Sequence, residues 1–311
     1  MSSARLVLMP LNYNGRDLLE TCLPSMIREA RAAPVPAEVW VIDNASQDDS
    51  RAYVQRHHPE ARWIAYPQNR KLAAYNEAVR DCPAPYVLLL NNDVVLEEGF
   101  IAPLLRRLES DASFFAVSPA IHAEDPGECY PRRRGGHFFH GHLAPVELEP
   151  GPGGCLYFHG AAALLHRDLF LELGGFDSMF FYMEDNDLSY RAWRRGHPCV
   201  FEPAARLRHL GGRTTLKVHG GKDARRGLKE RAMNLFVIKQ VQQPAWIANF
   251  FFWTALKAIK AALTLDRARA WALAETLRSL PQALKSRRQQ ARLADRVLME
   301  KISAMKLPHL K

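Results

Sequence analysis

Short apolar runs alternate with segments of helical spacing through the first ninety residues. Four apolar runs, at 5–11, 38–43, 61–66 and 86–90, predict strands that are buried on both faces. The segments between them, 17–32, 46–57 and 72–81, carry apolar residues at the spacing of amphipathic helices. This alternation predicts βαβ units, and therefore an α/β fold with a mostly parallel central sheet and flanking helices.

Polar residues end or follow three of these strands. Asn12 and Asn14 follow the first strand, Asp43 is the last residue of the second, and Asn92 and Asp93 follow the fourth. Ligands bind at the carboxyl ends of the strands in such sheets, so these residues are candidates for a binding site. A carboxylate at a strand end suits a hard divalent cation. Each residue also has a simpler interpretation, as a turn former or a helix cap.

Residues 122–154 are rich in proline, glycine, histidine and arginine. This composition predicts a long loop, and loops of such length are often functional. The segment holds His137, His140 and His142. They are read as surface histidines, with a metal site as the alternative.

The densest group of acidic residues lies further along the chain. Glu184, Asp185 and Asp187 follow the aromatic run 180–182 and open a predicted helix. Carboxylates are stabilised at a helix N-terminus, but one cap accounts for one of them and not for three. An apolar wall beside a carboxylate raises its pKa and makes it a better general base. His209 follows, two residues before a pair of glycines.

The order of these motifs resembles that of family 2 glycosyltransferases with the GT-A fold, and especially their bacterial rhamnosyltransferase-like branch. Five motifs of that family occur here in register, at 12–14, 41–50, 89–93, 174–191 and 209–212. Each motif is weak by itself, but five in the same order are specific. The resemblance spans about residues 5–240.

The resemblance assigns a role to each candidate residue. Asp185 is expected to act as the general base, and Glu184 to contact the acceptor or the donor sugar. Asp93 and His209 are expected to hold a divalent cation, Mg²⁺ or Mn²⁺, at the donor diphosphate. The expected nucleotide-sugar-binding residues are Asn12, Asn14, Asp43, Asn69, Asn76 and Asn92. The implied reaction is an inverting hexosyl transfer from a nucleotide-diphosphate sugar.

The sequence departs from the family pattern at two places. The family usually has a glycine in N-x-G-F-A-x-x-N, whereas this chain has Lys71 there, within 69–76. Arg70 and Lys71 are therefore a pair of cations that could lie near the diphosphate. The metal motif also carries a single carboxylate, Asp93, so metal dependence is less determined than the fold.

Composition and charge narrow the class of protein. The chain has 311 residues, of which 48% are hydrophobic and 24% are charged, as in ordinary folded proteins. Its five cysteines are scattered and the start is polar, which predicts a protein of the reducing cytoplasm without a secretion signal. Residues 222–311 carry 19 Lys and Arg against 6 Asp and Glu, whereas residues 1–221 are mildly acidic.

This basic C-terminal region contains an apolar segment, 246–265, that is interrupted by Lys257 and Lys260. Two lysines near its middle favour an amphipathic helix in the membrane interface over a spanning helix. The alternative is a pair of helices packed on the catalytic core. We therefore predict a catalytic domain at 1–240, a membrane-associating helical region at 241–311, and a peripheral protein at the inner face of the plasma membrane.

The function that the resemblance implies is transfer of a sugar, with rhamnose favoured, to a glycan or lipid-linked acceptor in cell-surface polysaccharide biosynthesis. The alternative is a non-catalytic protein of the same fold that binds a nucleotide sugar or serves as a scaffold. The sequence lacks the G-x-G-x-x-G motif of NAD-dependent oxidoreductases. It also lacks a zinc finger or RNP motif, so no nucleic-acid partner is expected.

Overall fold

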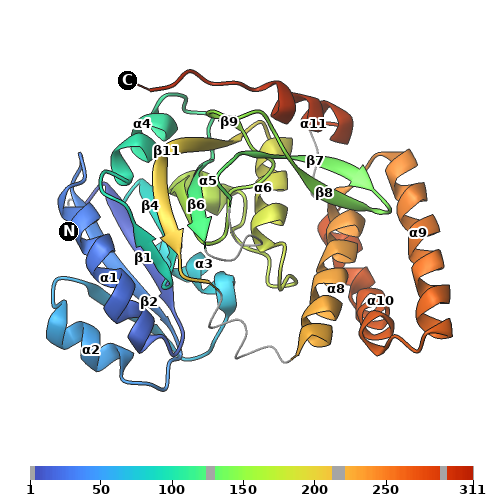
Figure 1. Cartoon of the computed structure of the whole chain (residues 1–311), viewed down its shortest axis with the longest axis horizontal. Helices are drawn as coiled ribbons and strands as arrows, with labels where there is room; N and C mark the ends of the chain where they lie inside the picture. Colours follow the sequence, from blue (N-terminus) through green and yellow to red (C-terminus); the bar gives the residue numbers. More distant parts are fainter. Residues whose placement is uncertain (1–3, 124–129, 212–220, 288–292, 311) are drawn as a thin grey trace.

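The computed structural model describes residues 4–123, 130–211, 221–287 and 293–310. Figure 1 shows a central sheet with helices on both faces and a group of helices, α8 to α10, beside it. Among the described residues, nine strands form the sheet, in the order β3-β2-β1-β4-β10-β6-β11-β5, with β9 paired to β11. The predicted α/β architecture is therefore confirmed.

The N-terminal half is built as the sequence pattern predicts. β1 pairs in parallel with β2 and β4, and β2 pairs in parallel with β3. Its strands are β1 (Leu6–Asn12), β2 (Ala37–Asn44), β3 (Arg62–Tyr66) and β4 (Tyr86–Asn91). Its helices are α1 (Arg16–Arg31), α2 (Ser50–His57), η1 (Lys71–Ala73) and α3 (Ala74–Asp81). The carboxyl ends of β1, β2 and β4 consequently meet at one edge of the sheet.

The second half mixes strand directions. β10 is antiparallel to both β4 and β6, while β11 is parallel to β6 and antiparallel to β5 and β9. The strands here are β5 (Val94–Leu96), β6 (Ala116–Ala123), β9 (Gly153–Gly154), β10 (Ala162–His166) and β11 (Cys199–His209). The helices are α4 (Ile101–Glu109), α5 (Arg167–Glu172) and α6 (Glu184–Arg194). Parallel order is thus confined to the β1–β4 half and to the β6–β11 pair.

The prediction of a long loop at 122–154 is wrong for much of that segment. β7 (Arg134–Phe139) and β8 (His142–Glu147) form an antiparallel hairpin. His140 and Gly141 make its two-residue turn, and both have positive φ, as a type I′ turn requires. Phe138 stacks on Trp246, and the Gly141 N–H donates to Asn249 Oδ1 at 2.9 Å. The hairpin therefore depends on a helix that lies more than a hundred residues later.

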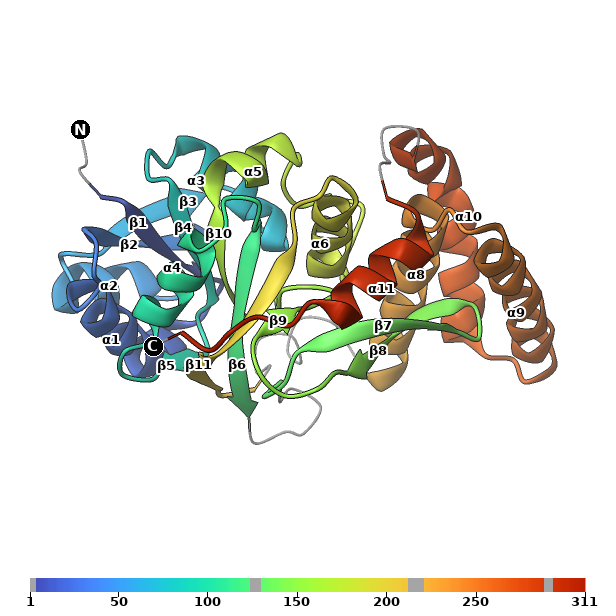
Figure 2. The ribbon, with the colours of Figure 1, turned by 90° about the horizontal axis from the view of Figure 1, so that it is seen from above.

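The C-terminal region is helical, as predicted. Its helices are α8 (Lys222–Gln240), α9 (Pro244–Leu263), α10 (Arg267–Arg287) and α11 (Asp295–Ala304). Figure 2 shows α9 at the outer side of this group, and the segment after α11 running back across the sheet towards α4. Asp295 at the start of α11 accepts hydrogen bonds from the Tyr190 hydroxyl and from Arg194. In the described ranges, no helix is long and apolar enough to cross a membrane.

The helix α9 leaves most of its apolar surface in solvent. Phe251 is 62% exposed, Phe252 59%, Ile259 58% and Leu263 81%. Only Phe250 and Ala261 of this helix are buried. The alternative of a helical pair packed on the core therefore accounts for α8 and α10, which pack along each other, but not for the outer face of α9.

Candidate active site

A cavity of about 460 Å³ lies at the carboxyl ends of β1 and β4, between the sheet and α6. Seven of the ten predicted site residues line it, although they come from five separate segments of the chain. These seven are Asn12, Asn69, Asn92, Asp93, Glu184, Asp185 and His209. The sheet topology explains the convergence, because β1 and β4 end at this edge and the antiparallel β10 begins there.

Buried amide side chains form the floor of the cavity. The Asn12 amide donates to Asp43 Oδ1 at 3.3 Å and to Ser46 Oγ at 3.1 Å, and Asn12 Oδ1 accepts from Asn92 Nδ2 at 2.8 Å. Gly15 permits this arrangement, because a Cβ there would come within 2.1 Å of Asn92 Nδ2. The chain of hydrogen bonds fixes the orientation of both amides at the strand ends.

Asp43 and Asn14 lie beside this cavity and do not line it. Asp43 accepts from Asn12 and from the Ser46 N–H, and it faces a neighbouring cavity of about 390 Å³ that Trp63 and Tyr66 also line. Asn14 accepts from the Gln47 N–H at 2.7 Å and has a positive φ. These contacts join the turn after β1 to the turn after β2. Asp43 is therefore next to a space where a nucleoside could bind.

Asn76 lies outside the cavity. Its amide donates to the Phe176 carbonyl and accepts from the Phe176 N–H, both at 2.8 Å. Both ends of this side chain are therefore engaged in fixing the Gly175–Phe176 turn to α3.

Asp93 and His209 form a buried pair. Asp93 Oδ1 and His209 Nε2 are 3.2 Å apart, on neighbouring strand ends. Two cis ligands of an octahedral Mg²⁺ or Mn²⁺ ion would be about 3 Å apart, given metal–ligand distances of about 2.1 Å. The pair therefore fits two positions of one such ion. Within the described residues, no third histidine, cysteine, aspartate or glutamate completes a metal-binding group.

Glu184 and Asp185 lie at the opposite wall, at the start of α6. Burial raises the pKa of Glu184 to about 7, an effect that Asp185 strengthens and Lys71 weakens. Burial also raises the pKa of Asp185 to about 6, against the N–H groups of Asn186 and Gly160. Asp185 accepts from Gly160 N at 3.0 Å and from Asn186 N at 2.8 Å, so both of its oxygens are oriented. Both carboxyl groups therefore lose their protons near neutral pH, and each can then act as a general base.

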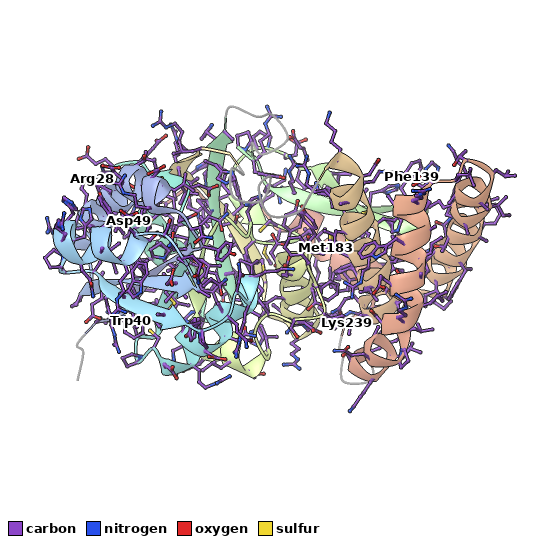
Figure 3. The ribbon with its side chains drawn as sticks, turned by 90° about the horizontal axis from the view of Figure 1, so that it is seen from below. Arg28, Trp40, Asp49, Phe139, Met183 and Lys239 are labelled. Atoms are coloured by element: carbon purple, nitrogen blue, oxygen red, sulfur yellow. The ribbon has the colours of Figure 1, made fainter. Side chains whose placement is uncertain are left out.

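The backbone before α6 is strained at this point. Tyr182 and Met183 both have φ near +70°, a conformation that side chains disfavour. Figure 3 labels Met183 at the junction between the sheet and the C-terminal helices. Phe181 and Tyr182 line the cavity beside the two carboxylates and supply the apolar wall that the sequence predicted. Strain of this kind is found at functional sites more often than elsewhere.

Asp187 has a separate, structural role. It is fully buried and accepts from Arg191 at 2.9 Å, from Gln240 at 2.6 Å and from Lys239 at 2.9 Å. Arg191 and Lys239 hold the pKa of Asp187 below its usual value despite its burial. Asp187 and Arg191 are four residues apart on α6, a spacing that places them on one face of the helix and allows this ion pair. Through Lys239 (labelled in Figure 3), the network also ties α6 to α8.

The segment 69–73 brings a cation into the cavity. Lys71 has a φ of +55° and lies where the family pattern has glycine. Asn44 holds this turn, because its amide accepts from Arg70 N and donates to the Lys71 carbonyl. Lys71 Nζ lies 3.7 Å from the centre of the Phe181 ring, on the side of Glu184. Arg70 pairs instead with Glu77 and stays outside.

The sequence analysis missed His159, Tyr130 and Lys229, which also line the cavity. His159 precedes β10, and its ring lies 4.2 Å from the Tyr130 ring. Burial lowers the pKa of His159 to about 3, so this imidazole stays neutral, and its Nδ1 accepts from the Ala161 N–H. β10 runs antiparallel to β4, so the residues before β10 lie at the same edge of the sheet as the residues after β4. His159 could therefore have been found only if the direction of β10 had been known.

The histidines of the hairpin do not all match the surface interpretation. His137 and His140 are exposed, as expected, although the His140 ring also contacts Trp253. His142 is only 7% exposed, so the surface interpretation is wrong for it. Four cysteines, Cys22, Cys82, Cys155 and Cys199, are buried free thiols, and Cys129 lies outside the described residues.

Comparison with known proteins gives one family and one fold. Residues 7–174 match the family described as Glycosyl transferase family 2. The N-acetylglucosaminyl-diphospho-decaprenol L-rhamnosyltransferase of Mycobacterium tuberculosis is 27% identical over 283 residues, which cover 80% of this chain and 88% of that protein.

Solved structures agree with the predicted GT-A fold. The crystal structure of GalNAc-T7 with UDP, GalNAc and Mn²⁺ superposes with a TM-score of 0.69 at 16% identity; the match covers 96% of this chain but only 56% of that one. The mannosyltransferase PcManGT from Pyrobaculum calidifontis, in complex with GDP-Man and Mn²⁺, gives a TM-score of 0.56 at 19% identity and covers 93% of this chain and 87% of its own.

Proposed function

This chain belongs to glycosyl transferase family 2, and on that premise we propose that it moves rhamnose from a nucleotide-diphosphate donor to a sugar carried on a lipid diphosphate. Its similarity to the mycobacterial rhamnosyltransferase, along most of both chains, supports this choice of donor and acceptor. The product would be a precursor of a cell-surface polysaccharide. Thymidine diphosphate rhamnose is the donor to test first.

The observation that carries this proposal is the pair of carboxylates at the start of α6, of which Glu184 is buried and Asp185 is half-buried. Asp185, with a pKa of about 6, would accept the proton of the acceptor hydroxyl as that oxygen attacks the anomeric carbon. The bond from that carbon to the diphosphate breaks in the same step, which inverts the anomeric configuration. Glu184 would orient a sugar hydroxyl from the adjacent position.

The donor would lie along the strand ends. Asp43 would bind the nucleoside in the neighbouring cavity, and Asn12 and Asn92 would contact the bound nucleotide from the floor. Lys71 would face the diphosphate, since it is a cation that lines the active-site cavity. Asn14 and Asn76 would act indirectly, by holding the turns that shape the site.

Asp93 and His209 would hold a divalent cation, Mg²⁺ or Mn²⁺. Such an ion, when bound, neutralises charge on the departing diphosphate. The supporting observation is the 3.2 Å separation of the carboxylate oxygen and the imidazole nitrogen. The Mn²⁺ in the two similar solved structures agrees with this assignment.

We also propose that the protein associates peripherally with the cytoplasmic face of the membrane. The exposed apolar side chains of α9 support this, as does the excess of 13 positive charges in 222–311. Apolar burial and attraction to anionic lipids act together in such helices. The division into a catalytic domain at 1–240 and this helical region is also a proposal. The helix α8 lies before residue 240 and α10 lies after it, and the two helices pack along each other.

A panel of nucleotide sugars tests the proposed function. The full chain is mixed with each donor and Mn²⁺, and both the melting temperature and transfer to a lipid-diphosphate N-acetylglucosamine acceptor are measured. A bound donor raises the melting temperature according to its affinity. Stabilisation by thymidine diphosphate rhamnose together with a disaccharide product is expected. Stabilisation with no product from any donor would favour the nucleotide-sugar-binding alternative.

A further inference from the structure

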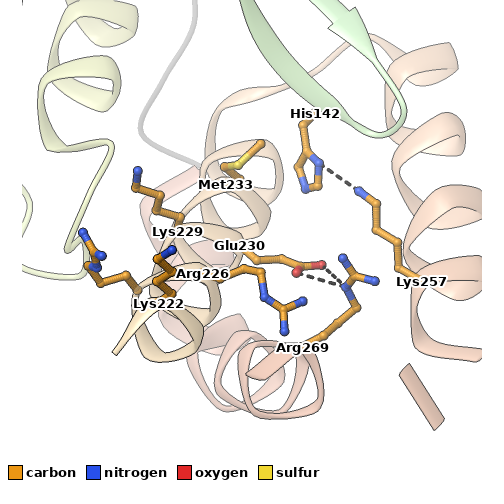
Figure 4. Close-up of a pocket in the computed structure, with 9 residues that line it drawn as sticks. His142, Lys222, Arg226, Lys229, Glu230, Met233, Lys257 and Arg269 are labelled. Carbon is orange, nitrogen blue, oxygen red and sulfur yellow. Dashed lines mark hydrogen bonds and ion pairs between the residues drawn. The ribbon is translucent and has the colours of Figure 1, made fainter. Parts of the chain in front are cut away.

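A second cavity, of about 550 Å³, lies between the helices α8, α9 and α10 and the β7–β8 hairpin (Figure 4). It is basic, with six cationic side chains against a single carboxylate. Its lining residues are His142, Lys222, Arg225, Arg226, Lys229, Glu230, Met233, Lys257 and Arg269. The proposed transfer reaction does not use this cavity, so its charge requires an explanation.

Half of these cations already have carboxylate or histidine partners. Arg226 pairs with Asp266, and Arg269 pairs with Glu230 at 2.9 Å. Lys257 donates to His142 Nδ1 at 3.0 Å, and His142 Nε2 lies 3.0 Å from Asn234 Oδ1. Because a lysine can only donate, His142 is the neutral tautomer with its proton on Nε2. These contacts build the walls of the cavity.

The remaining three cations, Lys222, Arg225 and Lys229, have no carboxylate within ion-pair distance among the residues that the structure describes. They lie at positions i, i+3 and i+7 of α8, so they share one face of the helix. Arg225 Nε is buried and has no hydrogen-bond partner there. Three such cations on one wall are suited to an anion with about two charges and several acceptor oxygens.

This cavity adjoins the active site. Lys229 lines both cavities, and its Nζ lies 5.3 Å from the centre of the Tyr182 ring, which also lines the active site. A ligand whose sugar occupies the space beside Glu184 and Asp185 can therefore continue past Lys229 into the basic cavity. The lysine at the junction would contact whatever group follows the sugar.

We propose that this basic cavity binds the diphosphate of the lipid-linked acceptor. The inference rests on the proposed function, in which the acceptor sugar is attached to a lipid through a diphosphate. That diphosphate carries two negative charges directly beyond the sugar, where Lys222, Arg225 and Lys229 are available. The lipid then continues towards α9, whose apolar face is exposed on the outer side of the same helical group.

The test compares two acceptors that share a sugar. One is N-acetylglucosamine joined through a diphosphate to a short alkyl chain, and the other is the alkyl glycoside without the diphosphate. The variant Lys222→Gln/Arg225→Gln removes two cations that lie outside the proposed catalytic residues. Loss of charged hydrogen bonds to the diphosphate is expected to raise the KM for the first acceptor about tenfold or more. The KM for the donor and for the alkyl glycoside should not change.

The matched control is Arg278→Gln/Lys285→Gln on α10. Arg278 is exposed, and both residues lie outside the cavity. This control removes the same charge from the same helical group, and it should leave all KM values unchanged. An equal rise for both acceptors, or no rise for the diphosphate acceptor, would overturn the proposal. So would a loss of binding to phosphatidylglycerol vesicles with an unchanged acceptor KM, which would identify a membrane headgroup site.

Calorimetry without a donor separates this inference from the proposed function. The wild-type chain should bind the alkyl diphosphate sugar, and Lys222→Gln/Arg225→Gln should bind it about tenfold more weakly or worse. If that difference is found but no donor yields a product, the cavity assignment stands and the transfer reaction is wrong. If the wild-type chain does not bind the diphosphate compound, the cavity assignment itself fails.

Discussion

Asp93 and His209 carry the metal assignment, and Asp93 can be tested alone. Asp93→Ala removes a carboxylate that is 3.2 Å from the imidazole. We expect this variant to fold, and to lose the enhancement of donor binding by Mn²⁺. Asp93→Asn keeps the shape and removes the charge, so it should show most of the same loss. Titration of the nucleotide sugar with Mn²⁺ and with EDTA measures the effect, and undiminished Mn²⁺-dependent binding in either variant would refute the assignment.

Glu184 should reduce the stability of the fold at neutral pH. Its pKa of about 7 in the folded protein exceeds the ordinary value of 4.5, so the folded state retains a proton that the unfolded chain releases. The cost is therefore absent below pH 4.5 and complete above pH 7, where it amounts to about 3 kcal/mol at most. Glu184→Gln should have the melting temperature of the wild type at pH 4 and a higher one at pH 8.

Asp187→Asn is the matched control for that measurement, because its pKa shift has the opposite sign. Arg191 and Lys239 lower the pKa of Asp187, so its charge stabilises the fold at pH values above the ordinary value of 3.8. Asp187→Asn should therefore lower the melting temperature at pH 8 and lower it less as the pH falls. Equal effects of pH on the two variants would contradict the assignment of separate roles.

Lys71 combines an unfavourable backbone conformation with a useful charge. Its φ of +55° is the conformation that glycine adopts without strain, so Lys71→Gly should leave stability within about 1 kcal/mol of the wild type. Loss of the cation should weaken donor binding about tenfold, which corresponds to about 1.4 kcal/mol of binding free energy. Lys71→Ala loses the charge but keeps the strain, so both variants should bind the donor equally weakly, in a direct binding assay. Donor affinity of Lys71→Gly equal to that of the wild type would show that the charge does not contribute.

At the scale of elements, the sequence predicted best where local pattern and tertiary environment agree. β1, β2, β3 and β4 were predicted to within one or two residues. β1, β2 and β4 are buried along most of their length and read as apolar runs, whereas β3 is half-buried to exposed, so its predicted burial on both faces is wrong. The β7–β8 hairpin was not predicted, because Gly135 and Gly136 make the sequence of β7 resemble that of a loop. The hairpin is stabilised instead by its contacts with Trp246 and Asn249 of α9. Contacts between distant segments cannot be seen in a local pattern.

The helix α9 is the element for which sequence and structure support the same membrane hypothesis. Phe252→Ser/Ile259→Ser replaces two side chains that are each more than half exposed, so folding should be unaffected. Each such side chain is worth about 1.5 kcal/mol or more when buried in an apolar environment, so binding to anionic vesicles should weaken at least tenfold. Co-sedimentation with vesicles measures this, and Val297→Ser on α11 is the control. Equal sedimentation of wild type and variant would contradict the hypothesis.

At the scale of the whole molecule, the fold brings five segments of one chain to a single edge of the sheet. Their order in the sequence allowed Asn12, Asn92, Asp93, Glu184, Asp185 and His209 to be proposed together. The order could not show that Asn76 binds Phe176, or that α8 carries a basic cavity next to the active site. Both features depend on the packing of α3, α8 and the hairpin, which arises only in the folded chain.

The charge of the molecule also differs between its N-terminal part and its C-terminal helices. The mildly acidic N-terminal part holds the two active-site carboxylates, and the basic C-terminal helices hold the second cavity and the exposed face of α9. In our proposal, the N-terminal part carries out the transfer and the C-terminal helices bind the anionic lipid acceptor.

Asp185→Asn separates general-base catalysis from donor binding. In this variant we expect kcat for sugar transfer to fall by about 10²–10⁴, the usual contribution of a general base, while the dissociation constant of the nucleotide sugar changes by less than about twofold. In the wild type, kcat/KM should rise with pH through about 6, as the pKa of Asp185 requires. Turnover of Asp185→Asn equal to that of the wild type, with the same pH profile, would contradict the proposed mechanism.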